Sequence, residues 1–240
     1  MSDKAIFQQN NISAASFAMR PKSYEHSSPA ILSWLKAPRA GEVKTRLAQS
    51  IGPEAALKVY RVLVERQLSE LPPGHPLEIH YTPTDALDEM RAWLGDEYAF
   101  HAQCEGGLGI RLERAVADAF KRGAQSVICI GGDCPKLNRV HLEQTAAALQ
   151  SDYDIVFGPS EDGGYYLIGL NAHYPEVFQD IPWSTQATLE TSLKKSSTLN
   201  LRVKLLETLY DIDEIATLNK AIHQGLLPGK LNVHPQKPMI

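Results

Sequence analysis

The chain has 240 residues, a formal net charge of −4 and a hydrophobic fraction of 43%. This length and apolar content predict one large globular domain. The slight acidity argues against a general nucleic-acid binder, and no apolar run approaches the roughly 20 residues that a membrane-spanning helix needs. We therefore expect a cytoplasmic protein that has no membrane span and does not bind nucleic acid, and the sequence leaves its oligomeric state open.

The two ends of the chain differ from its middle. Residues 1–28 are polar and lack the continuous apolar segment of a secretory signal, so they are predicted to form a flexible extension. Residues 227–240 show no periodicity and are predicted to be a C-terminal tail. The folded domain is therefore expected over residues 29–226.

Cysteine usage fits a reducing compartment. Cys104, Cys129 and Cys134 match no zinc-binding spacing, and three cysteines do not make a disulfide framework. Cys129 lies within an apolar run and is expected to be part of the core.

Short apolar runs alternate with segments of helical period along the domain. In chain order we expect strand 29–35, helix 53–71, strand 77–82, helix 85–95, strand 97–103, helix 108–123, strand 126–132, helix 138–150, strands 153–158 and 164–170, helix 184–195, strand 201–207 and helix 213–226. This order predicts an α/β fold, a three-layer sandwich with a mostly parallel sheet. Ligands of such folds bind beyond the carboxyl ends of the strands, so the loops there are the candidate site.

Residues at the helix ends sharpen several of these boundaries. Pro53 suits the first turn of its helix, and Asn138 suits an N-cap. Ser184 or Thr185 is expected to cap the helix over residues 184–195, and Asp213 is a candidate cap for the last helix.

The loop after the first strand, KAPRAGEVKTRL, is basic and contains a glycine. The glycine permits close approach of the backbone to a ligand, and the basic side chains suit phosphate oxygens. The spacing is not that of a Walker A loop, and a solvated turn is the alternative. The candidate phosphate-binding residues are Lys36, Arg39, Gly41, Lys44, Thr45 and Arg46.

The loop GGDCP follows a fully apolar strand, which places Asp133 at the carboxyl edge of the sheet. A carboxylate there suits a hard divalent cation such as Mg²⁺ or Mn²⁺. Gly131 and Gly132 suggest that a ligand approaches the backbone. The alternative is a structural turn or cap residue.

Two further loops carry acids. Glu161 and Asp162 precede Gly163 and Gly164, and either acid could contact a metal, a sugar hydroxyl or an attacking group, although Asp-Gly is also a strong hairpin signal. Asp211 and Asp213 stand at a spacing of two, which would present both carboxylates to one metal.

A weaker candidate is QCEGGLG, residues 103–109. Its glycines could line a ligand cleft, with Gln103 or Glu105 near a base or sugar. A simple entry loop to the following helix is the alternative.

Taken together, the basic loop, GGDCPKL, EDGGYYLIGL, PWST and the final DID resemble a bacterial family of glycosyltransferase-like proteins, long catalogued as a domain of unknown function, some of whose members are assigned to arsenosugar biosynthesis. The resemblance covers roughly residues 29–222. It implies the GT-A fold of nucleotide-diphospho-sugar transferases, with two departures. The first strand is less uniformly apolar than expected, at Ser33 and Trp34, and the D-x-D motif is reduced to a single acid after two glycines.

The resemblance also implies roles for the residues. Asp133 would hold Mg²⁺ or Mn²⁺, Asp211 and Asp213 would form a second part of the metal site, and the basic loop would bind nucleotide phosphates. Asp162 or Glu161 would be the base for an acceptor hydroxyl or would orient the sugar. The expected partners are a nucleotide-sugar donor and a small-molecule acceptor, while base, sugar, acceptor and stereochemical course stay open.

Two other functions are compatible with these residues. A nucleotidyltransferase would use the same loop and metal and release pyrophosphate. A non-catalytic nucleotide-binding module would keep the fold without turnover.

Overall fold

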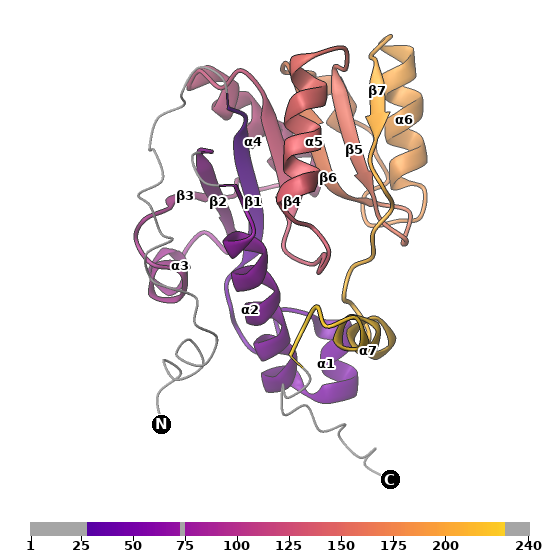
Figure 1. Ribbon diagram of the computed structural model, residues 1–240. Coiled ribbons are helices and arrows are strands. Elements are labelled where there is room, and N and C mark those ends of the chain that lie inside the picture. Colours follow the sequence, from indigo (N-terminus) through magenta and orange to yellow (C-terminus); the bar gives the residue numbers. More distant parts are fainter. Residues whose placement is uncertain (1–27, 73–74, 229–240) are drawn as a thin grey trace.

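The protein is described here by a computed structural model, which covers residues 28–72 and 75–228. The predicted N-terminal extension lies outside the described residues apart from residue 28, and so does the predicted tail beyond residue 228. A seven-stranded sheet with the strand order β3-β2-β1-β4-β6-β5-β7 forms the centre of the molecule (Figure 1).

The strands lie close to where hydrophobic periodicity predicts them. Their bounds are β1 Ala30–Lys36, β2 Leu77–Thr82, β3 Ala99–Ala102, β4 Val127–Gly131, β5 Ile155–Pro159, β6 Tyr165–Leu170 and β7 Val203–Leu205. All neighbouring strands pair in parallel except β6, which is antiparallel to both β4 and β5. The prediction of an α/β fold with a mostly parallel sheet is therefore confirmed.

The six predicted helices are likewise found close to their expected positions, whereas the short helix over Thr45–Ile51 and the 3₁₀ helix over Pro175–Phe178 were not predicted. Their bounds are α1 Thr45–Ile51, α2 Pro53–Ser69, α3 Leu87–Leu94, α4 Leu108–Lys121, α5 Arg139–Gln150, the 3₁₀ helix η3 Pro175–Phe178, α6 Thr188–Thr198 and α7 Ile215–His223.

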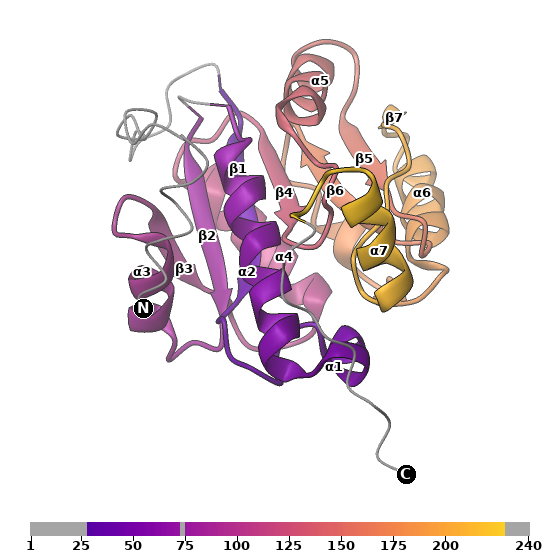
Figure 2. The same ribbon diagram turned by 60° about the horizontal axis from the view of Figure 1, so that its bottom comes forward.

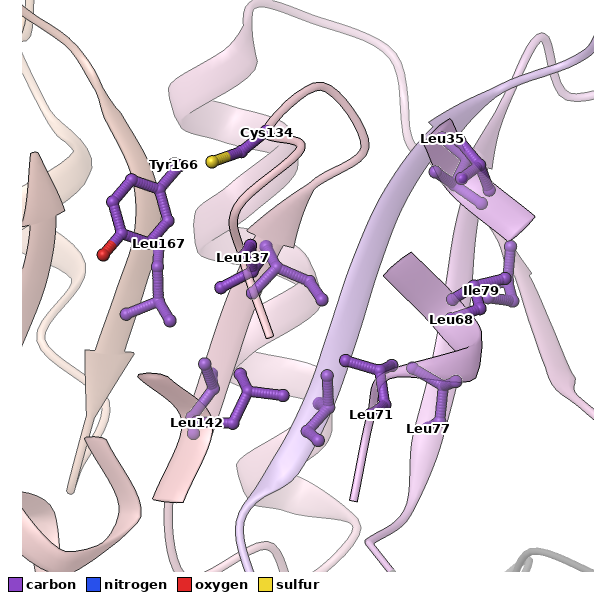
Figure 3. Packing of buried hydrophobic residues seen from close by; sticks show 14 of the residues in the cluster. Leu35, Leu68, Leu71, Leu77, Ile79, Cys134, Leu137, Leu142, Tyr166 and Leu167 are labelled. Carbon is purple, nitrogen blue, oxygen red and sulfur yellow. The ribbon is translucent and has the colours of Figure 1, made fainter. Parts of the chain in front are cut away.

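Apolar side chains fill both faces of the sheet, as expected for strands between two helical layers. One buried cluster joins the sheet to α2, α3 and α5. Another joins the opposite face to α4, α6 and η3. Figure 3 shows part of the first cluster, with Ile79 beside Leu68, and Cys134 beside Tyr166.

A third cluster lies beyond the carboxyl edge of the sheet. It packs α1, the first half of α2 and α7 around Tyr210 and Ile212. In Figure 1, α1 and α7 lie beyond the ends of the strands, near the end of α2, and in Figure 2, which brings this side forward, α7 lies in front of β5 and β6. Elements from both ends of the domain therefore meet at the edge where a ligand is expected.

Two predicted helix caps are wrong. Helix α6 begins at Thr188 with Ala187 at the N-cap position and no side-chain cap, so Ser184 and Thr185 belong to the preceding turn. Helix α7 is capped by Glu214, which forms a capping box with Thr217. Glu214 follows Asp213 directly, so Asp213 is not needed at the helix end.

The Asn138 cap of α5 is confirmed, since its Oδ1 accepts a hydrogen bond from the Val140 amide at 2.9 Å. The hairpin alternative for residues 160–164 is also confirmed, because these residues connect the antiparallel strands β5 and β6. This hairpin turn lies at the carboxyl edge of the sheet, so the hairpin does not remove its acids from the candidate site.

Candidate active site

Asp133 lies two residues after the end of β4, at the carboxyl edge, as predicted. The segment that carries the last two acids crosses to it, because the Ile212 amide donates to the Asp133 carbonyl at 3.0 Å. The same segment is held to the end of β5, where the Leu209 amide donates to the Pro159 carbonyl at 3.0 Å. Backbone hydrogen bonds thus bring the GGDCP loop and the DID segment together.

Lys44 of the basic loop lies between the acids of these two segments. Its Nζ is 2.5 Å from Asp133 Oδ1 and 3.4 Å from Asp213 Oδ1. The Lys44 side chain is only 3% exposed, whereas those of Asp133 and Asp213 are 49% and 33% exposed. The structure therefore brings two predicted acids, Asp133 and Asp213, to the buried ammonium group of a third predicted site residue, Lys44.

The backbone of Lys44 is in the left-handed region, with φ 49° and ψ 45°, immediately before α1. This conformation is uncommon for a residue with a side chain, and such residues are enriched at functional sites. Here it accompanies a side chain that turns inward, while the next basic residue, Arg46, stays 68% exposed and contacts Asp213 Oδ2 at 3.2 Å.

Asp211 is the most enclosed acid of the site. Ser160 donates its hydroxyl to Asp211 Oδ2 at 2.7 Å. The pKa of Asp211 is raised to about 6, chiefly by burial and also by the nearby charge of Asp133, while the Ser160 hydrogen bond and Lys44 act in the opposite direction. Asp211 is thus held by a neutral donor, whereas Asp133 and Asp213 share the Lys44 ammonium.

The start of the basic loop is fixed by Tyr60 of α2. The Lys36 amide donates to the Tyr60 hydroxyl at 2.9 Å, and this hydroxyl donates to the Lys36 carbonyl at 3.0 Å. Burial and the charge of Asp133 both raise the pKa of Tyr60. Tyr60 therefore stays a neutral phenol that anchors the end of β1.

Arg39 has other partners in this structure than the predicted phosphate. Its guanidinium forms hydrogen bonds to Glu89 of α3, at 2.5 Å for the shortest, and its pKa is raised by this carboxylate. Gly41 has a φ of +82°, and a Cβ built on it would meet no atom within 4 Å. Gly41 therefore leaves open space at the loop, and phosphate binding by Arg39 would require the loss of its contact with Glu89.

The two glycines before Asp133 have different surroundings. A Cβ on Gly131 would meet nothing within 4 Å, but a Cβ on Gly132 would lie 2.8 Å from Leu35 and 3.1 Å from Val64. Packing of β1 and α2 against the loop thus accounts for Gly132 without any ligand. The prediction that both glycines allow a ligand to approach the backbone therefore remains open only for Gly131.

The acids of the 160–164 turn point to separate partners. Glu161 pairs with Lys220 of α7 at 3.0 Å. Asp162 Oδ1 accepts the Gly164 amide at 2.9 Å, which leaves the other carboxylate oxygen without a protein hydrogen bond in the described part of the chain. Gly163 donates its amide to the Ser160 carbonyl and accepts the Leu189 amide, so the turn is tied to the start of α6.

The QCEGGLG segment is the entry loop of α4, as the alternative predicts, because Gly107 is the N-cap residue of that helix. The Gln103 side chain is buried and donates to the His80 carbonyl at 2.8 Å, and Arg111 donates to Gln103 Oε1 at 3.4 Å. Gln103 thus has a structural role below the edge of the sheet.

A divalent cation fits between Asp133 and Asp213, because a cation already stands there: the Lys44 ammonium contacts both carboxylates. Within residues 28–72 and 75–228 no group of three or more His, Cys, Asp or Glu side chains that could hold a metal is found. Mg²⁺ is commonly bound by one or two carboxylates and completed by substrate phosphates and water, so two carboxylates suffice for such a site.

Ser160 and Tyr60 are site residues that the sequence analysis missed. Ser160 could have been suspected as the first polar residue after β5. Tyr60 lies in the middle of an amphipathic helix, where nothing in the local pattern distinguishes it from a core residue.

Comparison with known proteins now adds to this geometry. A family profile described as "Uncharacterized protein conserved in bacteria (DUF2064)" matches residues 69–185. A crystal structure from Desulfovibrio desulfuricans G20, provisionally named a nucleotide-diphospho-sugar transferase, is 33% identical over 86% of this chain and 90% of its own, with a TM-score of 0.79. The chain belongs to the DUF2064 family.

More distant structures share the fold alone. A homologue of Mycobacterium tuberculosis Rv0371c from Mycobacterium sp. strain JC1 is 15% identical, with a TM-score of 0.51 over 81% of this chain and 96% of its own. CMP-2-keto-3-deoxy-manno-octonic acid synthetase, solved with CTP, is 12% identical, with a TM-score of 0.51 over 83% of this chain and all of its own. No curated protein matches the chain. Among the described residues, no helix has both the length and the apolar character to cross a membrane.

Proposed function

We propose that this family member is a metal-dependent glycosyltransferase that uses a nucleotide-diphospho-sugar donor. The observation that carries the proposal is the pair of carboxylates, Asp133 and Asp213, that shares one cation at the carboxyl edge of the sheet. The name of the 33% identical relative supports the same class of donor. The acceptor is a small molecule, with an arsenosugar precursor as one possibility from the family resemblance.

Each part of the site has a place in this reaction. When bound at Asp133 and Asp213, Mg²⁺ or Mn²⁺ supplies charge neutralisation for the diphosphate leaving group. Lys44 and Arg46 add positive charge on the same side, and Gly41 leaves room for the phosphates to approach the loop. These groups stabilise the negative charge that develops when the bond between sugar and diphosphate breaks.

The acceptor side of the site is assigned to the turn between β5 and β6. Asp162 has one carboxylate oxygen fixed by the Gly164 amide, and in this proposal its other oxygen accepts the proton of an acceptor hydroxyl or orients the sugar. Glu161 is the less suitable base, because its carboxylate pairs with Lys220.

A nucleotidyltransferase is the second candidate. Arg46 is 68% exposed beside Asp213, and Lys36 is exposed at the end of β1. Two such cations suit the additional charge of a triphosphate. The two reactions differ in their product, since only the nucleotidyltransferase releases pyrophosphate.

The test is a binding experiment followed by product analysis. Thermal unfolding of the wild type with Mn²⁺ is measured with nucleoside diphosphates, sugar nucleotides and nucleoside triphosphates. A ligand at 100 times its dissociation constant adds about 2.7 kcal/mol of stability. We expect a metal-dependent shift with a diphosphate or sugar nucleotide, lost in Asp133→Asn and kept in the control Asp152→Asn, an exposed aspartate outside the site.

The outcomes separate the candidates. A shift with triphosphates only, with pyrophosphate as product, would establish the nucleotidyltransferase instead. Tight nucleotide binding that Asp133→Asn leaves unchanged, without turnover, would leave a non-catalytic binding module. No shift with any nucleotide at saturating Mn²⁺ would refute the proposed function.

A further inference from the structure

The Lys44 ammonium stands where a divalent cation would bind. It contacts Asp133 at 2.5 Å and Asp213 at 3.4 Å, and only 3% of the side chain is exposed. Two carboxylates that close to one another are favourable only with a positive charge between them. In this structure the charge belongs to the chain itself, on Lys44.

A metal ion and the ammonium cannot share this position. Carboxylate oxygens bind Mg²⁺ at about 2.0–2.1 Å, which is closer than either Lys44 contact, so the metal would take the space between the acids. Two cations held by the same two oxygens would also repel each other. Entry of a divalent ion at Asp133 and Asp213 therefore requires that Nζ of Lys44 move away.

The diphosphate offers Lys44 a new partner. A lysine ammonium is a compact charge on a flexible stem and binds phosphate oxygens as readily as carboxylates. Lys44 belongs to the same loop as Gly41, which faces open space, so a phosphate bound at this loop would be a partner within reach of a flexible lysine side chain.

We propose that Lys44 occupies the cation position in the free protein and passes to the nucleotide phosphates when metal and nucleotide bind together. This inference rests on the proposed function, since it concerns the same site. Metal alone must displace Lys44 without compensation, whereas metal with a diphosphate gives Lys44 a partner. The two ligands therefore bind cooperatively, and Lys44 is the positioning residue that couples them.

A simpler explanation would treat Lys44 as one more positive charge near the site. Arg46 distinguishes the two explanations, because it also contacts Asp213, at 3.2 Å, but is 68% exposed and has no ion pair with Asp133. If only net charge matters, Lys44→Met and Arg46→Met change metal binding alike. If Lys44 occupies the metal position, only Lys44→Met removes a competitor.

The experiment measures Mn²⁺ binding by electron paramagnetic resonance, for the full chain, with and without a nucleoside diphosphate. In Lys44→Met we expect Mn²⁺ alone to bind at least about fivefold more tightly than in the wild type, within the usual range of coupling between two ligands. The gain in Mn²⁺ affinity that the diphosphate gives should be smaller in Lys44→Met. Arg46→Met should stay within about twofold of the wild type for Mn²⁺ alone.

Two results would overturn the inference: unchanged or weaker binding of Mn²⁺ alone to Lys44→Met, or an equal change in Arg46→Met. The proposed function can survive this outcome, because the wild type would still bind Mn²⁺ and nucleotide. It fails separately, when the wild type binds neither.

A second measurement uses the wild type alone and does not depend on the folding of a variant. Lys44 is labelled with an amine-acylating reagent, and its modification is followed by mass spectrometry. We expect slow labelling in the free protein, faster labelling with saturating Mn²⁺ alone, and protection when the diphosphate is added. Labelling that Mn²⁺ alone does not accelerate would contradict the displacement of Lys44.

Discussion

Gly163 and Gly41 have nearly the same backbone conformation but very different surroundings, and this allows a sharp test of how the site loops are packed. Their φ angles are +88° and +82°. A Cβ on Gly163 would lie 2.6 Å from the Gln186 Cα and would also collide with the Gln186 carbonyl, whereas a Cβ on Gly41 would meet nothing within 4 Å.

The expected loss of stability has two contributions, the left-handed backbone and the collision of the added Cβ. Alanine in the left-handed region costs about 1–2 kcal/mol at either position. At Gly163 the collision involves backbone, which cannot change rotamer, and overpacking of this kind adds about 1–3 kcal/mol. We expect Gly41→Ala to lower the free energy of unfolding by about 1 kcal/mol and Gly163→Ala by about 3 kcal/mol.

The assay is urea denaturation of both variants without metal or nucleotide, followed by circular dichroism. Losses that agree within about 0.5 kcal/mol would refute the reasoning, because they would mean that the turn moves freely away from residues 185–189. A loss in Gly41→Ala as large as that expected for Gly163→Ala would show that the basic loop is also tightly enclosed, against the open space seen there.

Three further predictions concern the frame that supports the site. Asp154 binds the Arg202 side chain and amide, and these hydrogen bonds lower its pKa from 3.8 to about 2. The stabilising contribution of the Asp154 carboxylate is therefore present above pH 4 and is lost as the pH falls toward 2. Because Arg202 is 56% exposed, we expect Asp154→Asn to lower the free energy of unfolding by about 1 kcal/mol at pH 7. A loss, measured by urea denaturation, that did not shrink between pH 5 and pH 3 would contradict this. Asn138→Ala removes the N-cap of α5 and should cost about 1 kcal/mol, whereas Asn138→Asp should cost less than half of that in the same chemical melts. Phe157 is fully buried, so Phe157→Ala should cost about 3–5 kcal/mol and Phe157→Leu clearly less; equal losses in thermal unfolding would argue against tight packing around this ring.

Hydrophobic patterns predicted most of the fold because each strand and helix carries its own period. The apolar strand before Asp133 and the helix that begins at Pro53 are set by residues next to one another in the chain. The pattern also placed the acidic loops at one edge of the sheet, because successive parallel strands present their carboxyl ends together.

Contacts between distant residues could not be predicted in the same way. Lys44 could be recognised as a loop cation, but its burial depends on packing of α1 against α7, which brings residue 213 beside residue 44. The role of Gly132 was missed for the same reason, since it depends on side chains from β1 and α2. The cap at Glu214 was missed for a local reason, because either of two adjacent acids suits the start of the helix.

The third hydrophobic cluster gives the site an unusual dependence on the end of the chain. Lys44 and Asp213 are brought together only when α7 packs on α1 and α2 through Tyr210 and Ile212. The Asp133 loop joins this arrangement through its carbonyl, which accepts the Ile212 amide. Ile212 lies between Asp211 and Asp213 and is fully buried, so its packing fixes the backbone that carries both acids. Loss of apolar packing at residue 212 would therefore separate the carboxylates from Lys44 without removing any charged group.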